Sequence, residues 1–170
     1  AALIAAGSLK EKIEHASTMG IKVSGPVEVD LAALVQWKAG IVKKLTGGVA
    51  QLFKHHKIET LAGQAKLAGP NRIEVKGRDG AATVKYEDVI LATGSRPIEI
   101  PGFKFDEKEV WSSTGALAPS RVPKRLLVIG GGYIGLELGT FFAKVGSEVT
   151  VVEMTGGLLP GTDPDLANVV

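Results

Sequence analysis

A chain of 170 residues is long enough for one ordinary domain or two small ones, and its 45% hydrophobic and 22% charged residues are typical of globular proteins. Its 20 basic residues nearly balance its 18 acidic ones, and no apolar run reaches the about 18 residues of a membrane span, so neither a nucleic-acid nor a membrane partner is expected. Cysteine is absent, which excludes a disulfide framework, Cys-bound zinc and a dithiol redox centre within these residues.

Two helices are expected in the first third of the chain. The apolar residues of segment 1–16 recur on one face, and Met19-Gly20 is typical of a helix end. Asp30 is placed to cap a long second helix, which keeps its apolar period up to the pair His55-His56. We interpret that pair as a solvated helix end, because no third histidine or spaced carboxylate completes a metal site. The chain opens inside a helix, so we expect it to be a piece of something longer.

The apolar period then changes from that of a helix to that of a strand. Four short strands are expected, at residues 58–67, 72–76, 82–85 and 89–92. Turns at Gly69-Pro70-Asn71 and Arg78-Asp79-Gly80 separate the middle strands. The segment is therefore predicted to be a small antiparallel meander.

Residues 94–123 contain four prolines and little periodicity, which predicts a connecting segment. We place a domain boundary near 120–123, which divides the chain into domains of residues 1–120 and 121–170.

A βαβ unit is expected in the second domain. Residues 125–129 form a strand that is apolar throughout after Arg125, of the kind found in parallel sheets. A helix is expected to follow as far as Lys144, and a second strand at residues 148–152. Asp163-Pro164 would begin another helix.

The first strand of this unit runs into a G-x-G-x-x-G motif made by Gly130, Gly132 and Gly135. In dinucleotide-binding folds the first glycine allows the tight turn, the second lets the backbone approach a pyrophosphate, and the third packs the helix on the strand. Glu153, at the end of the next strand, is placed to bind an adenosine ribose and to repel a 2′-phosphate, which favours NAD over NADP. The alternative is a glycine-rich turn in an unrelated α/β protein.

Two side chains at the start of the motif helix leave alternatives open. Glu137, taken to lie in the first turn, would complement the helix dipole or contact the nicotinamide end of the cofactor. Tyr133 would cover a cofactor pocket or would simply be a packed aromatic residue.

Two other segments carry weaker signals. Thr93-Gly94-Ser95 follows the apolar run VILA at a strand's carboxyl end, where open α/β sheets bind ligands, although a plain strand-to-loop turn is the simpler interpretation. Gly63-Gln64-Ala65 places small residues in a strand, which suits close approach to a ligand or a bulge.

The run VIGGGYIGLELG followed by VTVVEM resembles the NAD-binding motif of the flavin-dependent pyridine nucleotide-disulfide oxidoreductases. The segments LATGSRP, WSSTGAL and LLPGTDPDL stand in the order of that family, and KKLTGGVAQLFK makes the dihydrolipoamide dehydrogenases the most similar group. The resemblance implies an α/β fold: part of an FAD-binding domain, with two helices and an antiparallel β-meander, followed by the first βαβ of a Rossmann-like NAD-binding domain.

The resemblance also implies roles for individual residues. Thr93, Gly94 and Ser95 would lie against FAD, and the backbone of Ala65 would contact its adenine. NAD would be held by Gly130, Gly131, Gly132, Tyr133, Ile134, Gly135, Leu136, Glu137 and Glu153. No catalytic residue and no metal ligand is assigned to this chain.

In that family, electrons pass from a dihydrolipoyl group through a redox disulfide and FAD to NAD. The resemblance implies a homodimer that serves the lipoyl domains of 2-oxo acid dehydrogenase complexes, in the bacterial cytoplasm or the mitochondrial matrix. This chain lacks the family's first G-x-G-x-x-G and both redox cysteines, so by itself it is expected to be inactive. The alternatives are a glutathione or mercuric reductase-like member of the same family and a non-catalytic nucleotide-binding fragment.

Overall fold

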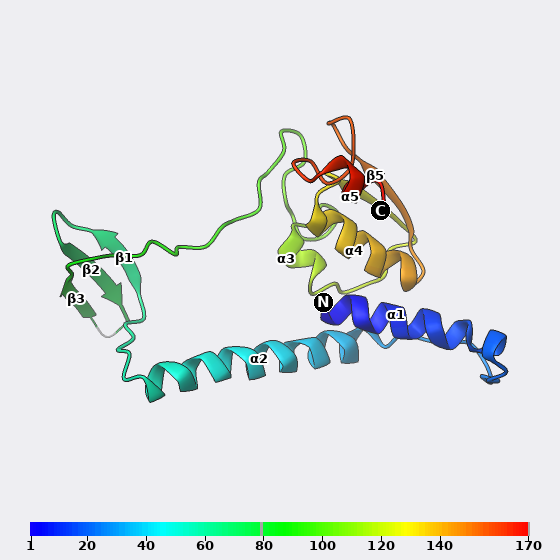
Figure 1. Cartoon of the computed structure of the whole chain (residues 1–170), viewed down its shortest axis with the longest axis horizontal. Coiled ribbons are helices and arrows are strands. Elements are labelled where there is room, and N and C mark those ends of the chain that lie inside the picture. Colours follow the sequence, from blue (N-terminus) through cyan, green and yellow to red (C-terminus); the bar gives the residue numbers. More distant parts are fainter. Residues whose placement is uncertain (79, 170) are drawn as a thin grey trace. The chain divides into compact units, whose positions relative to one another are not determined.

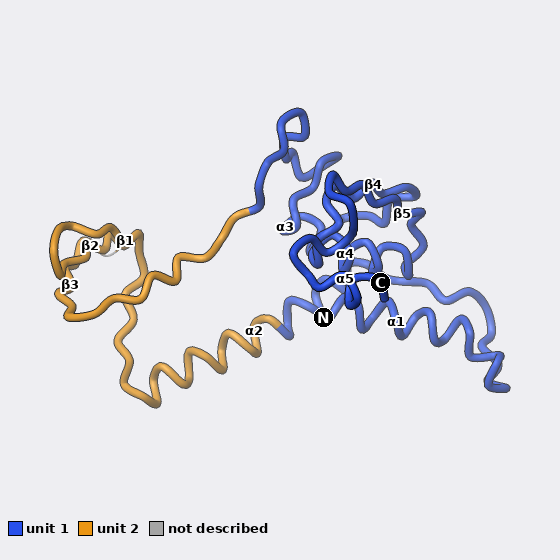
Figure 2. The backbone as a smooth tube through the Cα atoms, turned by 45° about the horizontal axis from the view of Figure 1, so that its top comes forward, with its two compact units in different colours: residues 1–41, 97–170 blue, residues 42–96 orange. Residues whose placement is uncertain are grey.

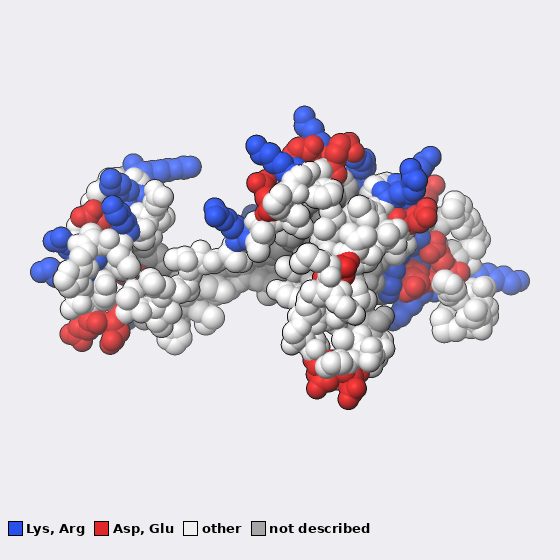
Figure 3. Space-filling view, turned by 90° about the horizontal axis from the view of Figure 1, so that it is seen from above, with Lys and Arg blue, Asp and Glu red and all other residues white. Residues whose placement is uncertain are grey.

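The structure of the protein is a computed structural model that describes residues 1–78 and 80–169. Two compact units divide it, one made of Ala1–Ile41 and Pro97–Val170 and the other of Val42–Arg96 (Figure 2). Each unit is described by itself below. On the face seen in Figure 3, acidic and basic side chains both occur on each unit, as the near balance of charge suggests.

The first unit contains the expected βαβ. Strand β4 (Arg125–Ile129) leads into helix α4 (Tyr133–Lys144) and then into strand β5 (Glu148–Val152). The two strands pair in parallel, from Arg125 opposite Glu148 to Ile129 opposite Val152, and α4 packs on them (Figure 1). The α/β prediction for residues 121–170 is therefore confirmed.

Helix α1 (Ala2–Glu14) packs against α4 and closes the core of the first unit. That core is built on Leu3, Phe141 and Phe142, which are all less than 5% exposed. At the surface of this contact, the Lys144 Nζ atom lies 3.0 Å from the Glu11 carboxylate and 2.9 Å from the Ser8 hydroxyl.

The predicted start of the second helix is confirmed, whereas the first α-helix ends at Glu14, before the predicted Met19-Gly20. Helix α1 is followed by a 3₁₀ turn over Ala16–Met19, and Gly20 ends it with a φ of 78°. Helix α2 (Leu31–His55) begins where Asp30 Oδ1 accepts a hydrogen bond of 2.9 Å from the N–H of Ala33. Both signals are local, a left-handed glycine and an N-cap, and both fix a helix end without tertiary contacts.

The second unit contains a three-stranded antiparallel sheet. Its strands β1 (Gln64–Leu67), β2 (Arg72–Gly77) and β3 (Gly80–Lys85) lie in chain order, so the predicted meander is confirmed. The turn predicted at Arg78-Asp79-Gly80 includes Asp79, which lies outside the described residues. Residues 58–63 precede β1 without joining the ladder, so the first strand is shorter than predicted.

The strand predicted at residues 89–92 is wrong. The segment has no ladder partner among the described residues, and the side chains of Ile90 and Leu91 are 91% and 66% exposed. An apolar run becomes a strand only when another strand satisfies its backbone groups and a layer covers its side chains.

The connecting segment forms little regular structure, as expected, but local hydrogen bonds order it. The Asp106 carboxylate accepts bonds of 2.8 to 2.9 Å from the N–H groups of Lys108, Glu109 and Val110, and these bonds lower its pKa. The short helix α3 (Ser113–Ala116) follows. Trp111 then packs on the ring of Phe142 at 5.8 Å and so fixes the segment to α4.

The chain ends in the short helix α5 (Pro164–Ala167), which begins after the cap of Asp163, as the sequence predicts. None of the helices in the described part of the chain is both long and apolar enough to cross a membrane.

Replacement of Phe142 by alanine is expected to destabilise the first unit. Its side chain is 1% exposed and packs between Phe141 and Trp111, so the change should lower the free energy of unfolding by about 3–5 kcal/mol. Phe53→Ala is the matched control, because Phe53 is 40% exposed on α2 and should cost about 1 kcal/mol or less. Urea unfolding measures both, and equal losses would contradict this description of the core.

Candidate functional site

The turn between β4 and α4 is built as a dinucleotide-binding motif requires. Gly130 has a φ of 105°, a left-handed conformation that side chains rarely adopt, and its N–H donates to the carbonyl of Val152 over 2.8 Å. The first glycine of the motif therefore turns the chain while it remains tied to the neighbouring strand.

Gly135 allows α4 to approach β4 closely. A Cβ atom at this position would lie 2.5 Å from the carbonyl oxygen of Gly130 and 2.9 Å from Val128 Cγ1. One turn later, a Cβ on Gly139 would make only ordinary contacts, at 3.4 Å or more from the valine side chains of the sheet. The packing role predicted for the third glycine is thus visible as a steric constraint.

Gly132 has a different reason to be glycine. Its φ and ψ of −76° and 170° suit any residue, and a Cβ there would meet no protein atom within 4 Å. Neither backbone strain nor packing demands a glycine here. The open space beside its backbone is what a pyrophosphate needs.

The start of α4 offers hydrogen-bond donors to an anion. Gly132 precedes the helix and supplies no side-chain cap, and the first bond into the helix runs from the N–H of Leu136 to the carbonyl of Gly132. The N–H groups of Tyr133, Ile134 and Gly135 therefore have no partner within residues 1–78 and 80–169. Together with the helix dipole, they form a site for phosphate oxygens.

The Glu153 carboxylate lies across this turn. Its Oε2 accepts a bond of 2.6 Å from the N–H of Gly131, and its Oε1 accepts from the N–H and hydroxyl of Thr155, at 2.8 and 2.9 Å. Donors favour the charged form, so the Thr155 N–H, then the Gly131 N–H and then the Thr155 hydroxyl lower the pKa of Glu153 from 4.5 to about 2. The carboxylate is held ionised beside the glycine turn.

A loop after β5 also contacts the turn, and sequence reasoning missed it. The N–H of Leu159 donates to the carbonyl of Gly131 over 2.8 Å, and a Cβ on Gly131 would lie 2.7 Å from the Leu158 side chain. Thr155 was missed as well. Its one sequence signal is a hydroxyl residue two positions after a carboxylate, which is common in local side-chain turns.

The structure decides part of what the sequence left open for the helix start. Tyr133 is 70% exposed and Ile134 is 46% exposed, so Tyr133 is not a packed aromatic residue. Leu136 is half-buried. Glu137 is exposed and is the fifth residue of α4, so its predicted place in the first turn is wrong. A helix dipole acts most strongly on charges in the first turn, so Glu137 gains less from the dipole than expected.

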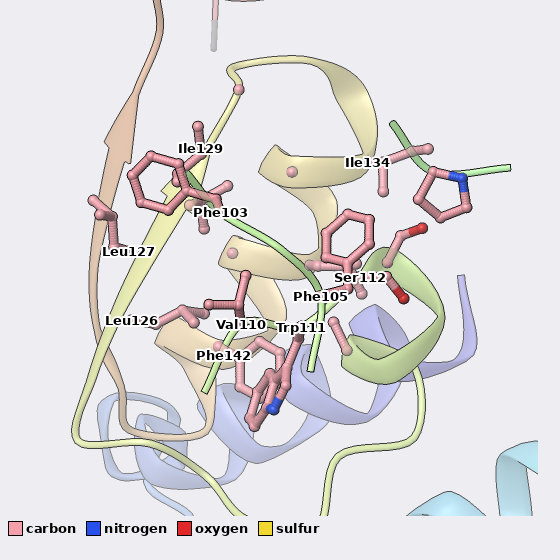
Figure 4. Close-up of a pocket in the computed structure, with 18 of the residues that line it drawn as sticks. Phe103, Phe105, Val110, Trp111, Ser112, Leu126, Leu127, Ile129, Ile134 and Phe142 are labelled. Carbon is pink, nitrogen blue, oxygen red and sulfur yellow. The ribbon is translucent and has the colours of Figure 1, made fainter. Parts of the chain in front are cut away.

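A mainly apolar cleft of about 630 Å³ extends from the turn along β4. Its walls come from β4, α4 and the connecting segment; Phe103 lies by Leu127 and Ile129, and Trp111 by Phe142 (Figure 4). This lining does not suit phosphates, whose donors lie at the start of α4, beside the lining residue Gly132.

The residues expected to contact FAD lie in the second unit. Ala65 pairs with Val75 in the edge strand β1, while Thr93, Gly94 and Ser95 are exposed in an extended segment, with a φ of 75° at Gly94. No strand leads into Thr93, so neither the strand-end interpretation nor the plain strand-to-loop turn holds here. These residues present backbone groups but no phosphate cradle like the one at α4, so they fit the flavin cofactor only in part.

Gly63 has a structural explanation. A Cβ there would lie 2.6 Å from the carbonyl oxygen of Lys76, so the neighbouring strand β2 requires this glycine. The described residues contain no group of three or more potential metal ligands, and His55 and His56 simply pack edge to face at 5.0 Å.

Comparisons with known proteins agree with this geometry. Residues 3–170 match the sequence model of a family described as "Pyridine nucleotide-disulphide oxidoreductase". The chain is 46% identical over 169 residues to a dihydrolipoyl dehydrogenase of Geobacillus stearothermophilus, covering 99% of this chain and 36% of that protein. A mitochondrial dihydrolipoyl dehydrogenase of Arabidopsis thaliana is 46% identical over 167 residues, which cover 97% of this chain and 33% of that protein.

Solved structures share the fold. LpdA from Mycobacterium tuberculosis superposes with a TM-score of 0.85 at 22% identity, over 99% of this chain and 37% of that one. The flavoprotein disulfide reductase RclA from Escherichia coli gives a TM-score of 0.75 at 25% identity, over 98% of this chain and 34% of that one. The chain therefore spans about a third of the length of its relatives, here 36% and 33% of two of them.

Acid is expected to weaken the loop around Glu153. A carboxyl whose pKa is lowered on folding stabilises the folded state above its unfolded pKa, and that stabilisation disappears as the pH falls through the folded pKa. The difference in free energy of unfolding between the protein and its Glu153→Gln variant should therefore be constant above pH 4.5 and should shrink between pH 4.5 and about 2. Urea unfolding from pH 7 to pH 2 measures this difference. A difference that stays constant down to pH 2 would refute the claim that hydrogen bonds hold the Glu153 carboxylate ionised.

Proposed function

Because the chain belongs to the pyridine nucleotide-disulphide oxidoreductase family, we propose that its glycine turn binds NAD and that the complete protein is a dihydrolipoyl dehydrogenase. The observation that carries the NAD assignment is the Glu153 carboxylate held 2.6 Å from the N–H of Gly131, beside the open face of Gly132. The relatives at 43–46% identity, all called dihydrolipoyl dehydrogenases, support the choice of substrate.

The chain's own residues would divide the recognition of NAD between them. The N–H groups at the start of α4 would bind the pyrophosphate, with Gly130, Gly131 and Gly132 forming the approach. Glu153 would accept hydrogen bonds from the adenine ribose and would repel a phosphate at the 2′ position. Tyr133 and Leu136 would also contact NAD, and Ile134 and Glu137 would lie toward its nicotinamide end.

The overall reaction takes two electrons and two protons from the two thiols of a dihydrolipoyl group, which becomes a cyclic disulfide. NAD⁺ accepts a hydride and one proton is released. FAD, when bound, supplies the electron relay between thiols and nicotinamide, and Ala65, Thr93, Gly94 and Ser95 would contact it. The 170 residues contain no cysteine, so the disulfide exchange must use residues outside this chain.

The setting of the reaction follows from the same relatives. We propose that the complete protein is a homodimer that oxidises the lipoyl domains of 2-oxo acid dehydrogenase complexes. It would act in the cytoplasm of a bacterium or in the mitochondrial matrix of a eukaryote, since relatives from Arabidopsis thaliana and Dictyostelium discoideum are called mitochondrial.

A second candidate function is nucleotide binding without catalysis. The observation that favours it is the absence of cysteine from a chain that nevertheless keeps the whole glycine turn. In that case the chain would bind NADH and would turn over no dihydrolipoamide.

Gly132→Ala is expected to weaken NADH binding without unfolding the protein. The added methyl meets no protein atom, so stability should change by about 1 kcal/mol or less, whereas it would fill the space of the pyrophosphate and cost about tenfold or more in affinity. Gly139→Ala, within the helix that follows and in ordinary contact with the sheet, is the control. Calorimetric titration with NADH measures both, and undiminished affinity in Gly132→Ala would remove the site from this turn.

Glu153→Arg in the complete protein is expected to reverse the choice of cofactor. The complete protein should oxidise dihydrolipoamide with NAD⁺, and the variant should lose NAD⁺ affinity and gain use of NADP⁺, because an attractive charge replaces a repulsive one. Glu153→Gln, which removes the charge but keeps a hydrogen-bond acceptor, should fall between the two. An unchanged ratio of kcat/KM for NAD⁺ and NADP⁺ would show that another residue selects the cofactor.

A further inference from the structure

Thr155 holds the carboxylate on which the proposed NAD site depends. Its Oγ1 lies 2.9 Å from Glu153 Oε1 and 3.1 Å from the carbonyl oxygen of Gly157. A hydroxyl donates a single proton, so these two oxygens compete for it. The side chain is exposed, so packing does not explain its position.

The acceptor positions of Glu153 are nearly all used within the chain. An ionised carboxylate offers about four of them. The N–H of Gly131 takes one on Oε2, and the N–H and hydroxyl of Thr155 take two on Oε1. A single ribose hydroxyl can therefore be accepted while the Thr155 proton points to Glu153, and two can be accepted once it turns to Gly157.

We propose that Thr155 is a positioning residue for the adenine ribose of NAD, holding the Glu153 carboxylate on the glycine turn and then passing its hydrogen bond to Gly157 when the ribose diol binds. The inference rests on the proposed function, because it concerns the same site. In this exchange Glu153 Oε1 replaces the Thr155 hydroxyl with a ribose hydroxyl, and the Gly157 carbonyl oxygen accepts from Thr155. The diol therefore gains its second hydrogen bond without leaving any of these oxygens unpaired. The carboxylate is also kept where a 2′-phosphate would lie, so the hydroxyl contributes to the preference for NAD.

The chain offers a matched set of variants. Thr155→Val keeps the shape of the side chain and removes its hydroxyl, and Thr155→Ser keeps the hydroxyl. Thr162→Val makes the same change in the same loop, at a hydroxyl that has no hydrogen bond to any described residue. Each variant is made in the complete protein and compared with the unmodified form.

Two readouts are measured, the dissociation constants of NADH and NADPH by calorimetry, and KM and kcat with NAD⁺. In Thr155→Val the NADH affinity should fall by about three- to tenfold, and the ratio of NADH to NADPH affinity should become smaller. The KM for NAD⁺ should rise, while kcat at saturating NAD⁺ should stay unchanged. Thr155→Ser and Thr162→Val should behave as the unmodified protein.

The outcomes separate the inference from the proposed function. If the unmodified protein binds NADH and Thr155→Val binds it equally well, with the same preference over NADPH, the positioning role is overturned while the NAD site stands. Equal losses in Thr155→Ser and Thr155→Val would show that the hydroxyl does not by itself preserve binding, which also overturns the proposal. If the unmodified protein binds no NADH, the proposed function fails and the inference fails with it.

Discussion

The close contact between α4 and β4 at Gly135 is the constraint on which the candidate site depends. The backbone carbonyl of Gly130 occupies the space where any side chain at Gly135 would begin, so the helix can start directly above the end of the strand. That position aims the helix N-terminus at the space beside Gly132 and brings the end of β5 within reach of the turn. The steric fit of one glycine thus decides where the donors for an anion lie.

Glu153 adds a charge to this arrangement, and local hydrogen bonds fix it before any ligand arrives. A flexible carboxylate would have to be ordered on binding, whereas this one is held by the N–H groups of Gly131 and Thr155. The same donors keep it ionised far below neutral pH. Rigid packing places the backbone of the site, and hydrogen bonds place its side chain. Because of this division, loss of the Thr155 hydroxyl should lower ligand affinity, whereas loss of packing under α4 should lower the free energy of unfolding.

Features with local causes could be predicted from the sequence, and features with tertiary causes could not. Residue type and spacing over a few positions predict four features of the structure. These are the N-cap Asp30, the left-handed Gly20, the meander and the βαβ unit. The apolar run at residues 89–92 shows the limit, because its pattern is that of a strand and no partner strand exists among the described residues. Within the site, the glycines and Glu153 carry a recognisable spacing, while Leu159 contacts the turn through its backbone and leaves no signal in the sequence.

The apolar cleft along β4 can be understood from the composition of that strand. All but the first residue of β4 are apolar, a pattern typical of strands covered by a layer on each face, and α4 covers one face only. On the other face, Leu127 and Ile129 remain 54% and 39% exposed, and Phe103 from the connecting segment covers them only in part. The cleft therefore borders a sheet face that the described residues do not close, and a ligand is not needed to explain its apolar lining. The polar groups beside Gly132 differ from this lining, because the N–H groups at the start of α4 and the Glu153 carboxylate serve no packing purpose that the structure shows.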